Sequence, residues 1–230
     1  MKALSIVIPV LDDAPALDRL LVQLQPERGP LAEVIVVDGG SRDGLAAVCA
    51  GRVDRLLVTP PGRARQMNAG AAAASGRALW FLHADSRLPP DAVAMVLQAL
   101  RLRFWGRFDV RIEGRSPWLP LIARMMNLRS RWTGIATGDQ GVFVRTQCFQ
   151  RLGGFADLPL MEDVEFSRRA RALGRPACLV QRLVTSGRRW DRHGAWRTIA
   201  LMSWLRLRFW LGADARALHA LYYPTQGKPR

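Results

Sequence analysis

Short apolar runs alternate with helical patterns through the first half of this chain of 230 residues. Helices are predicted over Pro15–Leu24, with Asp12 or Asp13 as the cap, and over the alanine-rich stretch Met67–Ala74. Strands separated by helices of about ten residues form a parallel sheet with right-handed crossovers. The first half is therefore predicted to be α/β. The predicted strands are Leu4–Val10, Val34–Asp38, Leu56–Thr59 and Leu79–Leu82.

The second half changes character. Apolar and charged residues partly alternate from Phe104 to Ile112, which predicts an antiparallel, half-exposed strand. Gly141–Val144 is another short predicted strand, and Glu162–Leu173 is a predicted helix that begins with acids and ends near Arg171. No linker or internal repeat is present, so residues 1–230 are predicted to form one domain.

The charge of the chain is strongly positive. Its 34 Lys and Arg residues against 19 Asp and Glu residues give a net charge of +15. Such a surface attracts nucleic acid, anionic lipid or phosphorylated substrates. No basic helix or aromatic-basic sheet motif of a nucleic-acid-binding protein is present. An anionic membrane surface is therefore the preferred partner among these, and no nucleic acid is expected.

Cysteine use and hydropathy bear on the compartment. Cys49, Cys148 and Cys178 are odd in number and widely spaced, as expected for free thiols in a reducing compartment. The first apolar run is too short for a signal peptide, and no run reaches the roughly 18 apolar residues of a spanning helix. We expect a cytoplasmic protein, attached peripherally to the inner face of the cell membrane.

One apolar run stops abruptly on an acid. Leu79–Leu82 is followed by His83-Ala84-Asp85, so Asp85 lies at the carboxyl end of a predicted strand, where α/β sheets bind ligands. A carboxylate there can hold a divalent metal that in turn holds a diphosphate. Alternatively, Asp85 only caps the next helix. His83 would share one side of an extended chain with Asp85, either as a second metal ligand or as a hydrogen-bond partner.

A second acid ends the strand Val34–Asp38. Asp38 is followed by small residues, including Gly40 and Ser41, that let a ligand approach the backbone. Its carboxylate can accept hydrogen bonds from a pyrimidine ring or a ribose hydroxyl. The alternative is a plain turn in which Ser41 or Asp43 caps a helix.

The segment Gly62–Gly70 is basic and opens a helix. Arg63 or Arg65 can meet phosphate oxygens with a fork of donors, reinforced by the helix amino terminus. Solvated arginines in a loop are the alternative.

The sequence Glu162-Asp163 is the strongest general-base candidate, because transfer from a diphosphate to a hydroxyl needs a carboxylate to take the acceptor's proton. Helix-dipole stabilisation alone also selects an acid pair at a helix start. The polar turn Gly138-Asp139-Gln140 can orient a sugar or acceptor hydroxyl.

Together these segments resemble the family-2 glycosyltransferases, specifically the short single-domain bacterial members, from Ser5 to about Trp190. Ser5–Val10 is similar to the family's first strand, although Asp12-Asp13 stands where Asn-Glu is usual. His83-Ala84-Asp85 occupies the place of the family's Asp-x-Asp, with histidine replacing the first acid. Arg188-Arg189-Trp190 resembles the Arg-Trp ending of processive members, but the accompanying Gln-x-x pattern is not intact, so processive polymerisation is not supported.

The resemblance implies the GT-A fold, a Rossmann-like, mostly parallel sheet flanked by helices, with a smaller antiparallel acceptor-side portion. Residues 1–100 would bind the nucleotide sugar, residues 101–195 would form the acceptor and catalytic half, and residues 196–230 a helical extension. It also implies an inverting enzyme, a nucleotide-diphosphate sugar donor, Mg²⁺ or Mn²⁺, and a hydroxyl acceptor. Asp85 and His83 would hold the metal, and Asp163 would be the base beside Glu162. The expected donor-binding residues are Pro9, Asp38, Gly40, Ser41, Arg63, Arg65, Asn68, Ala84, Asp139, Gln140, Arg188 and Arg189.

Two further helical segments suggest where the acceptor comes from. Trp118–Leu128 places Leu121, Ile122, Met125 and Met126 opposite Arg124 and Asn127, and Trp196–Leu211 is apolar nearly all round, interrupted by Arg197, Arg206 and Arg208. Tryptophan and arginine together suit the surface of an anionic membrane that presents a lipid-linked acceptor. Core packing or a homodimer interface is the alternative. For the whole chain, the rival functions are a nucleotidyltransferase of similar fold and a basic nucleic-acid-binding module.

Overall fold

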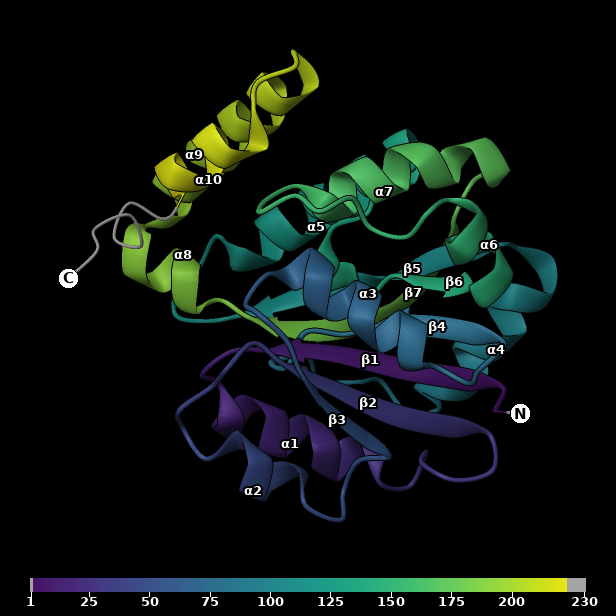
Figure 1. The fold of residues 1–230 in the computed structure, drawn as a ribbon. Coiled ribbons are helices and arrows are strands. Elements are labelled where there is room, and N and C mark those ends of the chain that lie inside the picture. Colours follow the sequence, from purple (N-terminus) through teal and green to yellow (C-terminus); the bar gives the residue numbers. More distant parts are fainter. Residues whose placement is uncertain (1, 223–230) are drawn as a thin grey trace.

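Seven strands form one sheet in the order β3-β2-β1-β4-β6-β5-β7 in the computed structural model, which describes residues 2–222 (Figure 1). Among the strands within that range, β6 alone runs antiparallel to its neighbours. The carboxyl ends of the other strands therefore share one edge of the sheet. The strands are β1 (Leu4–Val10), β2 (Ala32–Asp38), β3 (Arg55–Val58), β4 (Ala78–Phe81), β5 (Trp105–Glu113), β6 (Phe143–Arg145) and β7 (Ala177–Ser186).

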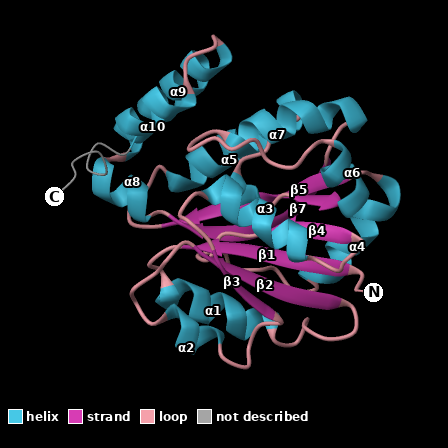
Figure 2. Ribbon diagram, in the orientation of Figure 1, coloured by secondary structure: helices cyan, strands magenta, loops and turns pink. Residues whose placement is uncertain are grey.

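Helices cover both faces of the sheet (Figures 1 and 2). Helices α1, α2 and α4 pack on one face, and α3, α6 and α7 pack on the other. Helices α8, α9 and α10 lie beyond the carboxyl ends of the strands. The helices are α1 (Ala14–Leu24), α2 (Leu45–Cys49), α3 (Arg63–Ala73), α4 (Ala92–Leu102), α5 (Leu119–Thr133), α6 (Thr146–Arg151), α7 (Glu162–Ala170), α8 (Arg188–His193), α9 (Ala195–Trp210) and α10 (Ala215–Tyr222), with short 3-10 helices η1 (Gly138–Gln140) and η2 (Arg171–Leu173).

The central strand β1 shows why these residues form a doubly covered sheet. Leu4, Ile6 and Ile8 face the α1 side and Val7 faces the α3 side, and all four are fully buried. Burial of each such side chain contributes about 1.5–3 kcal/mol. The predicted mostly parallel α/β fold is confirmed. A strand that is buried on both faces needs a continuous apolar run, which is the pattern that β1 shows.

The antiparallel, half-exposed strand predicted from Phe104 to Ile112 is wrong in two respects. Strand β5 is parallel to β7 along most of its length and meets an antiparallel partner only at β6. Most of it is buried, including Arg107, which has no exposed surface. Arg107 forms an ion pair with Asp109, which also accepts a hydrogen bond from Arg131 of α5 at 2.6 Å. Arg107 and Asp109, whose charges predicted exposure to solvent, are thus paired with each other beneath α5.

The cap of α1 also differs from the prediction. Asp13 occupies the N-cap position without a side-chain capping bond, whereas Asp43 accepts the Ala14 N–H at 2.7 Å. Asp12 instead accepts the Arg42 N–H at 2.8 Å, and its own N–H donates to the Ser41 hydroxyl. The loop after β2 is therefore tied to the loop after β1, a pairing between segments distant in sequence.

Helix α5 presents a different face from the predicted one. Asn127 was expected opposite the apolar side but is buried, and its amide exchanges two hydrogen bonds with the backbone of Val110 at 2.9 and 3.0 Å. Leu121 and Met125 are about half exposed, whereas Ile122 is buried. A long-range polar contact therefore outweighs the apolar pattern of the isolated helix. Among the helices of residues 2–222, none has the length and apolarity to cross a membrane.

Gly70 sets the distance between α3 and the sheet. A methyl group at this position would lie 2.4 Å from Val7 Cγ1 and 3.0 Å from Val37 Cγ2. Both valines are buried in strands β1 and β2, which have little freedom to move. The close approach brings the amino terminus of α3, with Arg63, to the carboxyl edge of the sheet.

We predict that Gly70→Ala lowers the free energy of unfolding by about 1–3 kcal/mol, because overpacking outweighs the gain in helix propensity. Urea denaturation followed by circular dichroism measures the change. Ala72→Gly, at an exposed position of the same helix, is the control and should cost about 1 kcal/mol through propensity alone. A stabilised Gly70→Ala protein would show that the contact with Val7 is not tight.

Candidate functional site

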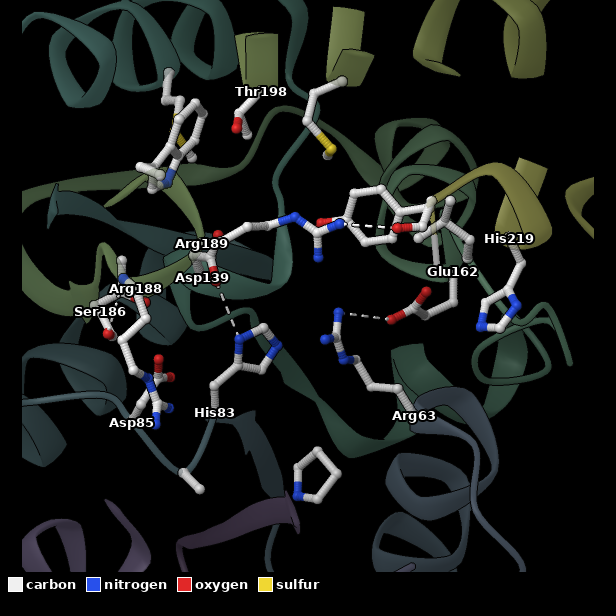
Figure 3. Close-up of a pocket in the computed structure, with 18 of the residues that line it drawn as sticks. Arg63, His83, Asp85, Asp139, Glu162, Ser186, Arg188, Arg189, Thr198 and His219 are labelled. Atoms are coloured by element: carbon white, nitrogen blue, oxygen red, sulfur yellow. Dashed lines mark hydrogen bonds and ion pairs between the residues drawn. The ribbon is translucent and has the colours of Figure 1, made fainter. Parts of the chain in front are cut away.

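A cavity of about 980 Å³ opens at the carboxyl edge of the sheet. Strand β1 contributes Pro9 and Val10, the loop after β4 contributes residues 83–85, and β7 contributes Ser186. Helices α3, α5 and α7 to α10 form the remaining walls. In the view of Figure 3, Asp85 and Arg188 lie at one end, Arg63 and Glu162 at the other, and His83 and Asp139 between them.

His83 and Asp139 form the central pair of the cavity. Nδ1 of His83 lies 3.1 Å from Oδ1 of Asp139. Burial alone would raise the pKa of Asp139, but the hydrogen bond and the charge of His83 hold that pKa below its usual value. Nε2 of His83 is buried without a hydrogen-bond partner among the described residues and packs against Gly138, where a Cβ would lie 2.5 Å away.

Hydrogen bonds of Thr137, Gly138 and Gln140 hold the turn that carries Asp139. Thr137 and Gln140 form a capping box around η1, in which Oε1 of Gln140 accepts the Thr137 N–H at 3.1 Å. The Gly138 N–H donates to Oδ2 of Asp163 at 2.7 Å, which fastens the turn to the start of α7. Gln140 is fully buried in this turn, outside the cavity wall.

The two acids that begin α7 occupy different places. Glu162 lines the cavity with its side chain 3% exposed, and it lies 3.5 Å from Nη1 of Arg63. Burial raises the pKa of Glu162; the charge of Arg63 opposes this shift and that of Asp163 adds to it. Asp163 does not line the cavity, and its carboxylate accepts the N–H groups of Gly138 and Val164. Met161 precedes them at a φ of 68°, a left-handed conformation that is uncommon for a side chain of this size.

Asp85 and Arg188 make up the opposite end, and Arg189 extends from there across the cavity (Figure 3). Within residues 2–222 the Asp85 carboxylate has no hydrogen-bond or ion-pair partner, so its oxygens are available to a ligand. Arg188 donates to Asp13 at 2.6 Å, and this hydrogen bond raises the pKa of Arg188, to which the charge of Asp85 adds. Arg189 donates to the Tyr222 carbonyl at 3.0 Å and stacks on the Tyr222 ring, which links α8 to α10.

Several sequence-predicted residues lie away from the cavity. Oδ1 of Asp38 accepts hydrogen bonds from the backbone N–H groups of Gly40 and Ser41 and from the Ser41 hydroxyl, at 2.6 to 3.0 Å. Arg65 pairs with Asp157 at 3.0 Å, and Asn68 exchanges hydrogen bonds with the Phe155 backbone. The cavity itself brings together Pro9, Arg63, His83, Ala84, Asp85, Asp139, Glu162, Arg188 and Arg189.

Sequence reasoning missed Arg129 of α5 as a cavity residue and read Arg206 of α9 as part of an interfacial helix. Both side chains line the cavity. Burial lowers the pKa of Arg129 to about 10, and repulsion by Arg206 adds to the shift. The available signal was the presence of single arginines in otherwise apolar helices.

Comparison with known proteins places this geometry in context. The profile described as "Glycosyl transferase family 2" matches residues 5–150. An uncharacterised glycosyltransferase of Mycobacterium tuberculosis is 30% identical over 203 residues, covering 80% of this chain and 75% of the relative. The undecaprenyl-phosphate 4-deoxy-4-formamido-L-arabinose transferase of Pseudomonas aeruginosa is 28% identical over 154 residues, covering 61% of this chain and 45% of that longer protein.

Solved structures show a similar fold. The mannosyltransferase of Pyrobaculum calidifontis, crystallised with GDP-Man and Mn²⁺, superposes with a TM-score of 0.67 at 20% identity. The match covers 96% of this chain and 69% of that one. The sheet and its helices therefore have the arrangement of the GT-A glycosyltransferases.

Proposed function

The chain belongs to glycosyl transferase family 2 and is a nucleotide-sugar-dependent glycosyltransferase, and on that premise we propose that it inverts the anomeric centre with the help of a metal. The observation that carries this proposal is the cavity at the carboxyl edge of the sheet, which gathers acids and arginines from segments distant in sequence. A departing nucleoside diphosphate needs positive charge, and an attacking hydroxyl needs a base. The cavity holds arginines for the first task and the acid Glu162, and Asp163, the proposed base, directly follows Glu162 in the chain.

Asp85 fits the role of metal ligand. Its carboxylate lines the cavity and has no hydrogen-bond partner within the described part of the chain. No group of three His, Cys, Asp or Glu residues among those described is arranged to hold a metal by itself. Such a site suits Mg²⁺ or Mn²⁺, which bind through one or two carboxylates together with substrate phosphates. When bound, the metal neutralises charge on the diphosphate.

His83 is proposed as the second metal ligand. The contacts of its two ring nitrogens indicate which of them would bind the metal. One ring nitrogen is bonded to Asp139 and the other packs against Gly138. Metal-binding histidines commonly donate their second nitrogen to a carboxylate, as His83 does toward Asp139. Its Nε2, which has no hydrogen-bond partner among the described residues, would therefore be the nitrogen offered to the metal.

Asp163 is the proposed base. Its two backbone hydrogen bonds fix the carboxylate, and each oxygen keeps a second lone pair for an acceptor proton. Glu162 would hold Arg63 in place through their ion pair. Arg63, Arg188 and Arg189 would stabilise the leaving diphosphate, since all three line the cavity. The donor nucleoside would extend toward the turn at Asp38, which follows the strand next to β1.

We predict that UDP or GDP with Mn²⁺ raises the melting temperature of this protein and that Asp85→Asn weakens nucleotide binding about tenfold or more in the presence of metal. Thermal-shift titration measures both. Asp91→Asn, an exposed carboxylate in the same loop, is the matched control and should behave as wild type. Stabilisation by a polynucleotide alone, with neither nucleotide effective, would overturn the assignment.

The acidic pair allows a second test. Asp163→Asn should reduce sugar transfer at least about a hundredfold while nucleotide affinity stays within about threefold, because asparagine keeps an oxygen for the Gly138 N–H but takes no proton. Nucleoside diphosphate release from a panel of nucleotide sugars measures turnover. Glu162→Gln should cost less. Full activity of Asp163→Asn together with an inactive Glu162→Gln would transfer the base role to Glu162, the member that lines the cavity.

We also propose that α5 and α9 rest on an anionic membrane surface that presents the acceptor. Trp118 and Trp196 touch across the two helices with ring centroids 4.9 Å apart. Trp196, Trp204 and Trp210 of α9 are between 45% and 80% exposed. Exposed tryptophans beside arginines are typical of interfacial helices. The name of the P. aeruginosa relative indicates a lipid-linked acceptor for that protein, which agrees with this proposal.

Co-sedimentation with liposomes tests the membrane contact. Binding should increase with the anionic lipid fraction, decrease with salt, and fall severalfold in a Trp204→Ser, Trp210→Ser double variant. Leu102→Ser removes an apolar side chain of α4 that is 84% exposed and should leave binding unchanged. Binding that is insensitive to anionic lipid would rule out the proposed surface.

A further inference from the structure

Two half-buried arginines face the cavity. Arg129 comes from α5 and Arg206 from α9. Neither forms a hydrogen bond or an ion pair with any described residue, and Nε and Nη2 of Arg129 and Nε of Arg206 are buried. Most buried guanidinium groups in proteins are paired, because an uncompensated buried charge is strongly destabilising.

The electrostatics of the pair are unfavourable without a bound anion. Burial lowers the pKa of Arg129 and of Arg206, and repulsion between the two lowers that of Arg129 further. Asp163 favours the charged form of both, and Asp139 favours that of Arg206, but neither carboxylate reaches hydrogen-bond distance. The site thus keeps two adjacent positive charges at a cost in stability, as expected of a site built for an anionic ligand.

The pair belongs to helices α5 and α9, whereas the arginines proposed to bind the diphosphate belong to α3 and α8. The carboxylates whose charge acts on Arg129 and Arg206 are Asp163 and Asp139, whereas Asp85 acts on Arg188. The charge of Asp163, the proposed base, acts on both arginines, and the acceptor must approach that base. Guanidinium groups bind phosphate with two parallel hydrogen bonds each, and two of them balance the charge of a phosphate dianion.

From this placement we propose that the acceptor carries a phosphate group and that Arg129 and Arg206 bind it, an inference that rests on the glycosyltransferase function proposed above. The apolar part of the same wall includes Ile122 and Met126 of α5 and Met202 of α9. These side chains come from the same two helices as the arginines, so they suit either a small phosphorylated acceptor or the first carbons of a lipid phosphate. Both sources share a phosphate monoester.

Inorganic phosphate is the probe, used on full-length protein saturated with UDP and Mg²⁺ so that the diphosphate site is filled. Phosphate should raise the melting temperature further, and isothermal titration should give its dissociation constant. Arg129→Gln and Arg206→Gln should each weaken phosphate binding about tenfold or more. Arg124→Gln, an exposed arginine of α5, is the matched control and should keep the wild-type constant.

Folding of the variants is checked in the same samples. Each should keep the wild-type stabilisation by UDP and Mg²⁺, and the unliganded variants should melt at or above the wild-type temperature because a repelling charge is removed. Arg206→Lys keeps the charge but not the planar fork and should bind phosphate more weakly than wild type and more tightly than Arg206→Gln.

The outcomes separate the two proposals. Wild-type protein that binds UDP but shows no response to phosphate, or an equal response in both glutamine variants, overturns the phosphate site and leaves the transferase function intact. Absence of any response to UDP and to GDP overturns both. Octyl phosphate distinguishes the sources: tenfold tighter binding than inorganic phosphate assigns a lipid phosphate, and equal binding assigns a small soluble acceptor.

Discussion

The hydrogen bond from the Gly138 N–H to the Asp163 carboxylate organises this protein's cavity. It joins η1 to the first turn of α7, while the neighbouring Asp139 holds His83 at the end of β4. Gly138 also permits the approach, because any Cβ would collide with the His83 ring. One short turn thereby sets the spacing between the loop that carries Asp85 and the helix that carries the acidic pair, through one backbone N–H and one side-chain pair.

Apolar runs and the acids that follow them predicted the strands of the first half of the fold. Strands β1, β2 and β4 are buried on both faces, so their apolar runs and their acidic ends were legible, and the sheet edge that carries Asp85 followed from them. The alternation in β5 misled because Arg107 and Asp109 neutralise each other beneath α5. Their spacing of two residues puts both on one face of the strand, but only the packing of α5, which adds Arg131, shows that this face is buried.

The residues of the candidate site were likewise predicted only in part. The residues at strand ends and helix starts were found because those positions are marked by glycine, proline and acids. Arg129 and Arg206 escaped notice because their meaning depends on α5 and α9 meeting across the cavity. For the same reason Arg65 and Asn68 were expected at the donor, although their partners, Asp157 and Phe155, lie far along the chain. A contact between residues that are far apart in the chain produces no periodic pattern in the sequence.

Much of the positive charge of the chain is solvent-exposed, but the arginines of the cavity come from α3, α5, α8 and α9. The parallel pairing of β5 with β7 joins Gly106 to Ala177, and the cavity joins Pro9 to Tyr222. Contacts between such distant segments close late and slow the search for the native state. Helices α8, α9 and α10 follow β7 in the chain, so during synthesis the cavity can close only after every strand of the described sheet has been made.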